Sequence, residues 1–227
     1  MQWLLKWRSF LQKAGLGLLT LGVVAFFYTG QEIFYYMKFG NDFKCHQLEE
    51  KDALPLAADF NFSPEPNSIF FHETSCRGSL RGRQACAIES AARMHPNKQI
   101  YVLFSSPVSD NTLRNSSLAK LSMYLNINFA RVHIAEYARN TPLEDLVASK
   151  EFYRSKWWVE HTSDVLRSLT LYKWGGVYLD MDMLVVKSLA SLGKNWVAKE
   201  QPLLVNGAAI AISKDRVGRK LINAIVE

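Results

Sequence analysis

Residues 158–182 read WVEHTSDVLRSLTLYKWGGVYLDMD. Apolar side chains recur at helical spacing through residues 158–174, which predicts an amphipathic helix. Gly175 and Gly176 are typical of the end of such a helix. The apolar run 177–179 follows directly and is typical of a short buried strand. This stretch therefore predicts one helix-to-strand unit of an α/β fold.

The chain after residue 67 continues this alternation of strands and helices. Short apolar runs predict further strands at 68–71, 99–105, 131–135 and 203–212. Helical patterns predict further helices at 83–94, 117–125, 141–147 and 217–227, the third with Thr141 as its N-cap, Pro142 in its first turn and Glu144 at N3. The alternation predicts an open, mostly parallel sheet flanked by helices, with ligands bound beyond the carboxyl ends of the strands.

Two carboxylates, Asp180 and Asp182, follow the strand predicted at 177–179. An Asp-x-Asp at the end of a strand can hold a hard divalent cation, which in turn binds a diphosphate. Such a cation acts as a Lewis acid that neutralises charge on a departing nucleoside diphosphate. The alternative is that the two acids only cap the following turn. That alternative does not account for the helix, the glycine pair and the strand that precede the acids.

Asp164 and Arg167 lie three residues apart on one face of the helix predicted at 158–174. One interpretation is a salt bridge within the helix. The other places both side chains beside a donor sugar, close in space to Asp180 and Asp182.

The N-terminal 37 residues resemble a membrane signal anchor. Residues 1–13 carry Lys6, Arg8 and Lys13 and no acid, and an apolar stretch covers most of 14–37. A cleaved signal peptide would need a small-residue cleavage site, and the aromatic residues after the apolar run offer none. A buried core helix would need packing partners of its own. A single transmembrane helix with a cytoplasmic tail at 1–13 is the favoured interpretation, and its short span suits the thin membranes of the early secretory pathway.

This topology would place everything after residue 37 in the lumen. Residues 38–67 mix charges and prolines without periodicity and are predicted to be a stem, and 68–227 is predicted to be the lumenal domain. A lumenal address makes Asn61 and Asn115 candidate glycosylation sites, since each begins an Asn-x-Ser sequence.

The composition argues against disorder and against nucleic-acid binding. The 227 residues are 48% hydrophobic and 21% charged, which is ordinary for a globular chain. The net charge is +6, but the basic residues are dispersed and form no stripe with interleaved aromatic residues. Three cysteines, 45, 76 and 86, leave one over if two are paired, and buried free thiols are the alternative.

Several motifs together resemble those of the α-1,4-glycosyltransferase family at its sugar-binding Asp-x-Asp region. The most specific are Ser163-Asp164-x-x-Arg167 and Trp174-Gly175-Gly176-Val177-Tyr178-Leu179-Asp180-x-Asp182. The resemblance runs from about residue 68 to 212 and also includes residues 69–75, Glu89 to Arg93 with His95-Pro96, residues 141–143 and Asn206-Gly207-Ala208.

The resemblance implies a GT-A fold, a UDP-sugar donor and dependence on Mn²⁺, with Mg²⁺ as the other possible cation. It also implies retention of anomeric configuration and a type II protein of the Golgi membrane. By match, Asp180 would contact the ribose and the metal, and Asp182 would ligate Mn²⁺. Asp164 and Arg167 would hold the sugar and the diphosphate, and Asn206 would contact the donor sugar. His72, Glu73 and Thr74 would border the uridine.

The function implied is α-1,4 transfer of a hexose or N-acetylhexosamine, with galactose or N-acetylgalactosamine expected, to a glycolipid or glycan. No nucleophile stands out, and a front-face displacement needs none. Nucleotide-sugar hydrolysis is a second possibility. The third is a catalytically impaired, membrane-anchored binding partner of other Golgi enzymes.

Two departures from the family carry expectations of their own. Cys76 replaces a residue that is usually not cysteine, which favours a Cys76–Cys86 disulfide. The chain ends at Glu227, where the family continues. The helix predicted at 217–227 is therefore expected to leave an apolar face near Val217 to Val226 incompletely covered, and transfer by this chain is expected to be weak.

Overall fold

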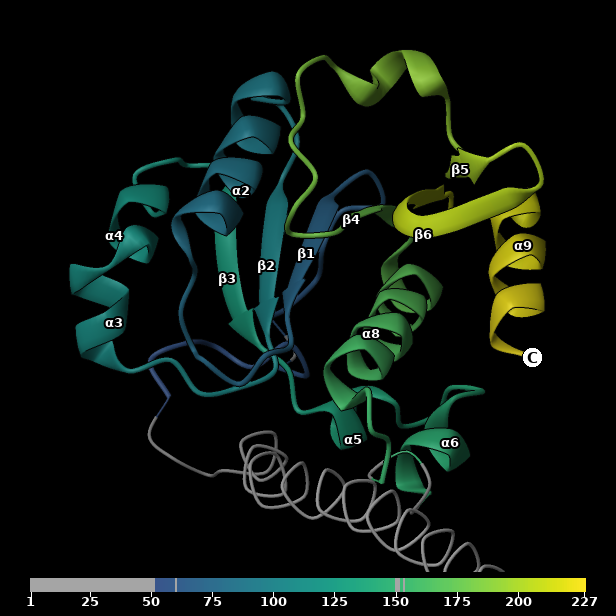
Figure 1. Ribbon diagram of the computed structural model, residues 1–227, viewed down its shortest axis with the longest axis horizontal. Helices are drawn as coiled ribbons and strands as arrows, with labels where there is room; N and C mark the ends of the chain where they lie inside the picture. Colours follow the sequence, from purple (N-terminus) through teal and green to yellow (C-terminus); the bar gives the residue numbers. More distant parts are fainter. Residues whose placement is uncertain (1–51, 60, 150–151, 153) are drawn as a thin grey trace, which may run out of the picture. The chain divides into compact units, whose positions relative to one another are not determined.

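The computed structural model describes residues 52–59, 61–149, 152 and 154–227, all of which belong to one compact unit, Cys45–Glu227. Its centre is a six-stranded sheet in the order β3-β2-β1-β4-β6-β5 (Figure 1). The strands are β1 Ile69–Glu73, β2 Ile100–Phe104, β3 Ile127–Arg131, β4 Gly176–Leu179, β5 Trp196–Gln201 and β6 Leu204–Ile212. Strands β1 to β4 run parallel, and β6 pairs antiparallel with both β4 and β5. The expected α/β fold with a mostly parallel sheet is confirmed.

Helices cover both faces of the parallel strands. The long ones are α2 Gly82–Met94, α8 Trp158–Trp174 and α9 Arg216–Val226. The short ones are α3 Asp110–Asn115, α4 Ser117–Leu121, α5 Ile134–Tyr137, α6 Glu144–Ala148 and the 3₁₀ helix Leu189–Leu192. Helix α8 begins and ends at the predicted residues, and the N–H of Gly175 donates to the carbonyl of Leu171 to close its last turn.

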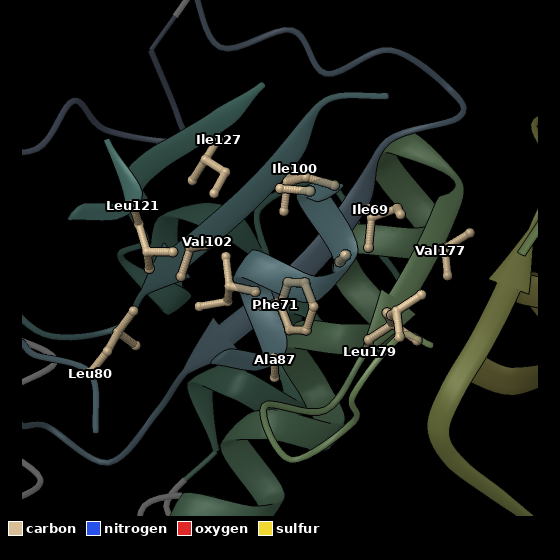
Figure 2. Close-up of a cluster of buried hydrophobic side chains, with 14 of the residues drawn as sticks. Ile69, Phe71, Leu80, Ala87, Ile100, Val102, Leu121, Ile127, Val177 and Leu179 are labelled. Carbon is tan, nitrogen blue, oxygen red and sulfur yellow. The ribbon is translucent and has the colours of Figure 1, made fainter. Parts of the chain in front are cut away.

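The main core lies between α2 and one face of the sheet (Figure 2). Side chains alternate along β1, so that Ile69 and Phe71 pack on this face with Ala87 of α2. His72, the next residue after Phe71, faces the opposite layer, where its ring contacts Tyr178 and hydrogen-bonds Thr170 of α8. Strand β1 is thus buried on both faces, as expected for the centre of a parallel sheet.

The strand predicted at 131–135 was placed too late in the chain. Strand β3 occupies Ile127–Arg131, and residues 134–137 form α5 instead. Pairing with β2 decides the register, because Ile100 lies opposite Ile127 and Phe104 opposite Arg131. The polar Asn128 interrupts the apolar run of this strand, so the sequence pattern did not indicate it. Its side-chain amide donates to the Gln99 side chain at 2.8 Å.

Two predicted helices also differ. The region predicted as 117–125 contains only α4, and α3 precedes it with Ser109 as its N-cap. Helix α6 begins at Glu144 rather than 141, because the Thr141 hydroxyl donates to the carbonyl of Ala138 and caps nothing. The Glu144 carboxylate instead accepts from the backbone N–H of Asn140 at 2.8 Å.

Part of the predicted stem packs on the domain. Leu54 and Ala57 are buried, and Leu56 forms a parallel bridge with Arg131 of the edge strand β3. The Asp52 carboxylate lies 3.2 Å from Nε of Arg131, whose side chain is 1% exposed. Burial lowers the pKa of Arg131 to about 10, and the charge of Asp52 opposes that shift. Residues 52–57 of the predicted stem thus belong to the same compact unit as the sheet.

The predicted tail at 1–13 and the anchor at 14–37 lie outside the described residues. Among the residues that are described, no helix has the length and apolarity required to cross a bilayer. Asn61 and Asn115 are both exposed, which a glycosylation site requires.

Helix α9 buries only part of its apolar surface. Gly218, Ile222 and Val226 face the domain, whereas the next stripe along the helix is exposed: Val217 59%, Leu221 43% and Ile225 50%. The expected incompletely covered apolar face is confirmed.

The predicted Cys76–Cys86 disulfide is wrong. Cys86 is a free, exposed thiol, while Cys76 is disulfide-bonded, and its partner therefore lies outside the described residues. The reason is the orientation of α2, which turns Ala87, Ile88 and Ala91 into the core and leaves Cys86 on the solvent side.

We expect native alkylation to distinguish the two thiols. Without reductant, Cys86 should be modified and Cys76 should not, because only the first is a free thiol. Peptide mapping of the alkylated full-length chain provides the measurement. A cross-linked peptide that joins Cys76 to Cys86 would contradict the structure.

Candidate functional site

A cavity of about 980 Å³ opens at the carboxyl ends of β1 and β4. Its walls also include the first turns of α2 and residues 159–167 of α8. The residues that the sequence suggested for binding the donor and the metal all line this cavity: His72, Glu73, Thr74, Asp164, Arg167, Asp180, Asp182 and Asn206. Residues separated by more than 130 positions in the chain thus face one space, at the edge of the sheet where ligands bind in α/β folds.

Asp180 is held in place by Tyr178, two residues earlier on β4. The Tyr178 hydroxyl donates to Oδ1 of Asp180 at 2.6 Å and lies 3.1 Å from the hydroxyl of Ser163 on α8. Burial raises the pKa of Tyr178, and the Asp180 carboxylate adds to that shift. Tyr178 therefore remains a protonated donor, and it orients one oxygen of Asp180 towards the protein.

Arg167 connects the helix to the strand. Its guanidinium forms an ion pair with Asp164, lies 3.7 Å from Oδ1 of Asp180, and stacks 5.2 Å from the centre of the Tyr178 ring. The predicted salt bridge within α8 is therefore present. It does not exclude a binding role, because the Asp164 side chain is still 57% exposed within the cavity wall.

The two acids fit a divalent cation that is shared with a ligand. Asp182 is exposed, and its carboxylate makes no hydrogen bond or ion pair with any of the described residues. Mg²⁺ and Mn²⁺ are commonly held by one or two carboxylates, with substrate phosphates and water completing the shell. No group of three or more His, Cys, Asp or Glu side chains that could hold a metal occurs within the described ranges. The protein groups of this cavity that could hold such a cation are the carboxylates of Asp180 and Asp182.

Asn206 lies within β6. Its side-chain amide donates to the Glu200 carboxylate at 3.0 Å and accepts from the N–H of Ala208 at 2.8 Å. These bonds support the β5–β6 hairpin at the rim of the cavity.

Two buried ionisable groups lie at the end of β1. Burial lowers the pKa of His72 to about 3, with a further contribution from the charge of Arg167, so the imidazole is neutral. Burial raises the pKa of Glu73, although the hydroxyl and N–H of Ser75 both donate to its Oε1. Oε2 of Glu73 and Nδ1 of His72 have no hydrogen-bond partner in the part of the chain that the structure describes.

The motifs match a known family. Residues 82–202 match the family described as glycosyltransferase sugar-binding region containing DXD motif, which covers more than half of the chain. The chain belongs to this glycosyltransferase family. The matched region contains Asp164, Arg167, Asp180 and Asp182.

Individual relatives agree with that assignment. The chain is 33% identical over 175 residues to lactosylceramide 4-alpha-galactosyltransferase of Mus musculus, which covers 76% of this chain and 46% of the relative. It is 26% identical over 126 residues to human alpha-1,4-N-acetylglucosaminyltransferase, covering 53% and 37%. The chain thus spans about half the length of the curated relatives it matches. A solved structure described as PaToxG Glycosyltransferase has 15% identity and a TM-score of 0.46, covering 87% of this chain and 68% of the other.

The basic side of the cavity was not predicted from the sequence. Arg77, Arg81 and Arg83 line it together with Gln84, from the loop after β1 and the first turn of α2. Their spacing alone carries no motif. A basic cluster just before a predicted helix start was the available signal, because a helix N-terminus favours anions.

Proposed function

We propose that this chain binds a UDP-sugar and a divalent cation in the cavity and transfers the sugar. The observation that carries the proposal is the convergence of Asp164, Arg167, Asp180 and Asp182 on one cavity at the carboxyl edge of the sheet. Two carboxylates and one arginine at that edge are the groups that a metal-bridged diphosphate and a sugar require.

Each residue has a distinct part in this proposal. Asp182 and the second oxygen of Asp180 would hold the cation, with Mn²⁺ favoured and Mg²⁺ possible. When bound, such a cation neutralises the charge that develops on the leaving diphosphate. Arg167 is kept beside the same carboxylate by Asp164 and Tyr178, and would contact the diphosphate. The exposed Asp164 would accept hydrogen bonds from sugar hydroxyls.

A more specific proposal about the donor sugar, the linkage and the acceptor follows the names of the relatives. It assigns α-1,4 transfer of galactose or N-acetylgalactosamine, with retention, to a glycolipid or glycan in the Golgi. The relatives support this class through their names alone, since one is a galactosyltransferase that acts on lactosylceramide and the other an N-acetylglucosaminyltransferase.

A screen of UDP-sugars against the full chain tests the proposal. Isothermal titration should show binding of UDP that requires Mn²⁺, and one UDP-sugar should bind more tightly than UDP. An assay that measures both transfer of the sugar to lactose and formation of free sugar by reaction with water distinguishes transfer from hydrolysis. Absence of any Mn²⁺-dependent UDP binding would refute the donor site itself.

Replacement of Asp164 should affect the sugar more than the nucleotide. We expect Asp164→Ala to weaken UDP-sugar binding about tenfold and UDP binding less than about twofold, since one hydrogen bond to a charged group contributes about 1.5–3 kcal/mol. Asp145→Ala, an exposed acid on α6 outside the cavity, is the matched control. Equal weakening of both ligands would place Asp164 away from the sugar.

A further inference from the structure

The cavity wall is divided by charge. Its acidic groups besides Glu73 lie on α8 and after β4: Glu160, Asp164, Asp180 and Asp182. On that side, Arg167 is already paired with Asp164 and lies near Asp180. The opposite side, from the loop after β1 to the start of α2, carries Arg77, Arg81 and Arg83.

Within the described ranges, the charges of these three arginines are hardly neutralised by acidic side chains. Arg77 approaches Glu73 at 3.7 Å and its side chain is 37% exposed. Arg81 and Arg83 are exposed and form no ion pair with any described residue. The first turn of α2 contains no acidic residue to offset its N-terminal dipole.

The loop that carries Arg77 and Arg81 is anchored at three points. The Thr74 hydroxyl donates to the carbonyl of Val159 at 3.2 Å, and the N–H of Gly78 donates to the Ser106 hydroxyl at 2.9 Å. Gly78 has a φ of +56°, and a Cβ there would meet the carbonyl oxygen of Pro107 at 2.2 Å.

The third anchor is Leu80, which is buried in the main core. Arg77 lies between these anchors, and Arg81 and Arg83 follow Leu80 closely in the chain. The three exposed guanidinium groups are therefore carried on a backbone that is already ordered. Such preorganisation reduces the entropy cost of binding a ligand.

We propose that Arg77, Arg81 and Arg83 form an anion-binding subsite, which takes a phosphate, sulfate or carboxylate group of a substrate. Arginine forms bidentate, charge-assisted hydrogen bonds with these groups. The inference rests on the proposed function, because it places the anion beside a donor held at the acidic side. The cavity volume lies near the upper end of the range for small-molecule sites, about 300–1,000 Å³, so it has room for more than a nucleotide.

Two sources can supply the anion, namely the donor's own phosphates or an acidic group on the acceptor. The first arm of the test compares acceptors. Lactose, lactose 3′-sulfate and 3′-sialyllactose are titrated into the full chain at low ionic strength, with and without saturating UDP and Mn²⁺. We expect the wild-type chain to bind the two charged sugars at least about tenfold more tightly than lactose. In the Arg81→Gln/Arg83→Gln double variant, all three sugars should bind with about the same affinity.

The second arm measures Mn²⁺-dependent UDP binding by the same double variant. A loss of about tenfold or more assigns the anion to the donor phosphates, whereas unchanged UDP affinity with lost discrimination among the sugars assigns it to the acceptor. Arg114→Gln removes an exposed arginine of α3 outside the cavity and is the control for net charge. Equal thermal midpoints for all variants exclude unfolding as the cause.

The subsite is refuted if the wild-type chain shows no preference for charged sugars and the double variant binds UDP normally. That result is distinct from failure of the proposed function, in which the wild-type chain binds no UDP in the presence of Mn²⁺. In that case, titration of the three sugars in the absence of nucleotide still tests the anion-binding subsite.

Discussion

Asp182→Asn should abolish practically all Mn²⁺-dependent UDP binding while leaving the fold intact. The substitution removes the carboxylate that has no other partner among the described residues, and an amide is a much weaker ligand for a hard cation. We expect a loss of about 100-fold or more in apparent UDP affinity, measured by titration at fixed Mn²⁺. The thermal midpoint should stay within about 2 °C, since surface substitutions usually change stability by less than about 0.5 kcal/mol.

The control for this result is Asp145→Asn, which makes the same chemical change at an exposed acid of α6. It should bind UDP as the wild-type chain does. Tyr178→Phe offers a graded comparison, because it removes the hydroxyl that holds Asp180 but leaves both carboxylates. Unchanged UDP affinity in Asp182→Asn would show that the cation, if used, is held elsewhere.

Gly176→Ala should be the most destabilising small substitution in the glycosyltransferase motif. Gly176 begins β4 with a φ of +93°, where an L side chain is strained. A Cβ there would lie 2.5 Å from the carbonyl oxygen of Ser68, which accepts the N–H of Val177 at 2.9 Å. Relief of that clash would have to disturb the pairing of β1 with β4 at the centre of the sheet.

The expected loss combines backbone strain with overpacking and amounts to about 2–5 kcal/mol. For a domain of this size that corresponds to a fall in Tm of about 5–20 °C, measured by circular dichroism. Gly82→Ala is the matched control, because a Cβ at Gly82 meets nothing within 4 Å and the position opens a helix. A stable Gly176→Ala protein would show that the β1–β4 contact can shift at little cost.

The pattern of residues along the chain was sufficient for most of the elements. The helix at 158–174 and the strand after it were predictable because helical spacing, a glycine pair and a short apolar run are all local signals. The acids at 180 and 182 could be placed at the edge of the sheet for the same reason. Asp164 and Arg167 followed from the resemblance, and the structure brings both to the cavity.

Predictions from the sequence failed where contacts with residues distant in the chain decide the local structure. Strand β3 was misplaced because Asn128 interrupts its apolar run, and only pairing with β2 shows that the segment is a strand. The packing of residues 52–57 on the sheet was not predictable either, because no local pattern reveals that Asp52 meets a buried Arg131. Cys76 and Cys86 are only ten positions apart, yet the rotation of α2 leaves Cys86 on its solvent side.

Local patterns in the sequence were enough to assign an α/β class, with a helix, a glycine pair, a buried strand and two acids in succession. The tertiary structure alone decided what shares the cavity with those acids. The order β3-β2-β1-β4 sets β1 beside β4, so that the loop after β1 brings Arg77, Arg81 and Arg83 opposite Asp180 and Asp182. The physical reason is that local patterns depend on residues a few positions apart, whereas a binding cavity depends on which strands become neighbours.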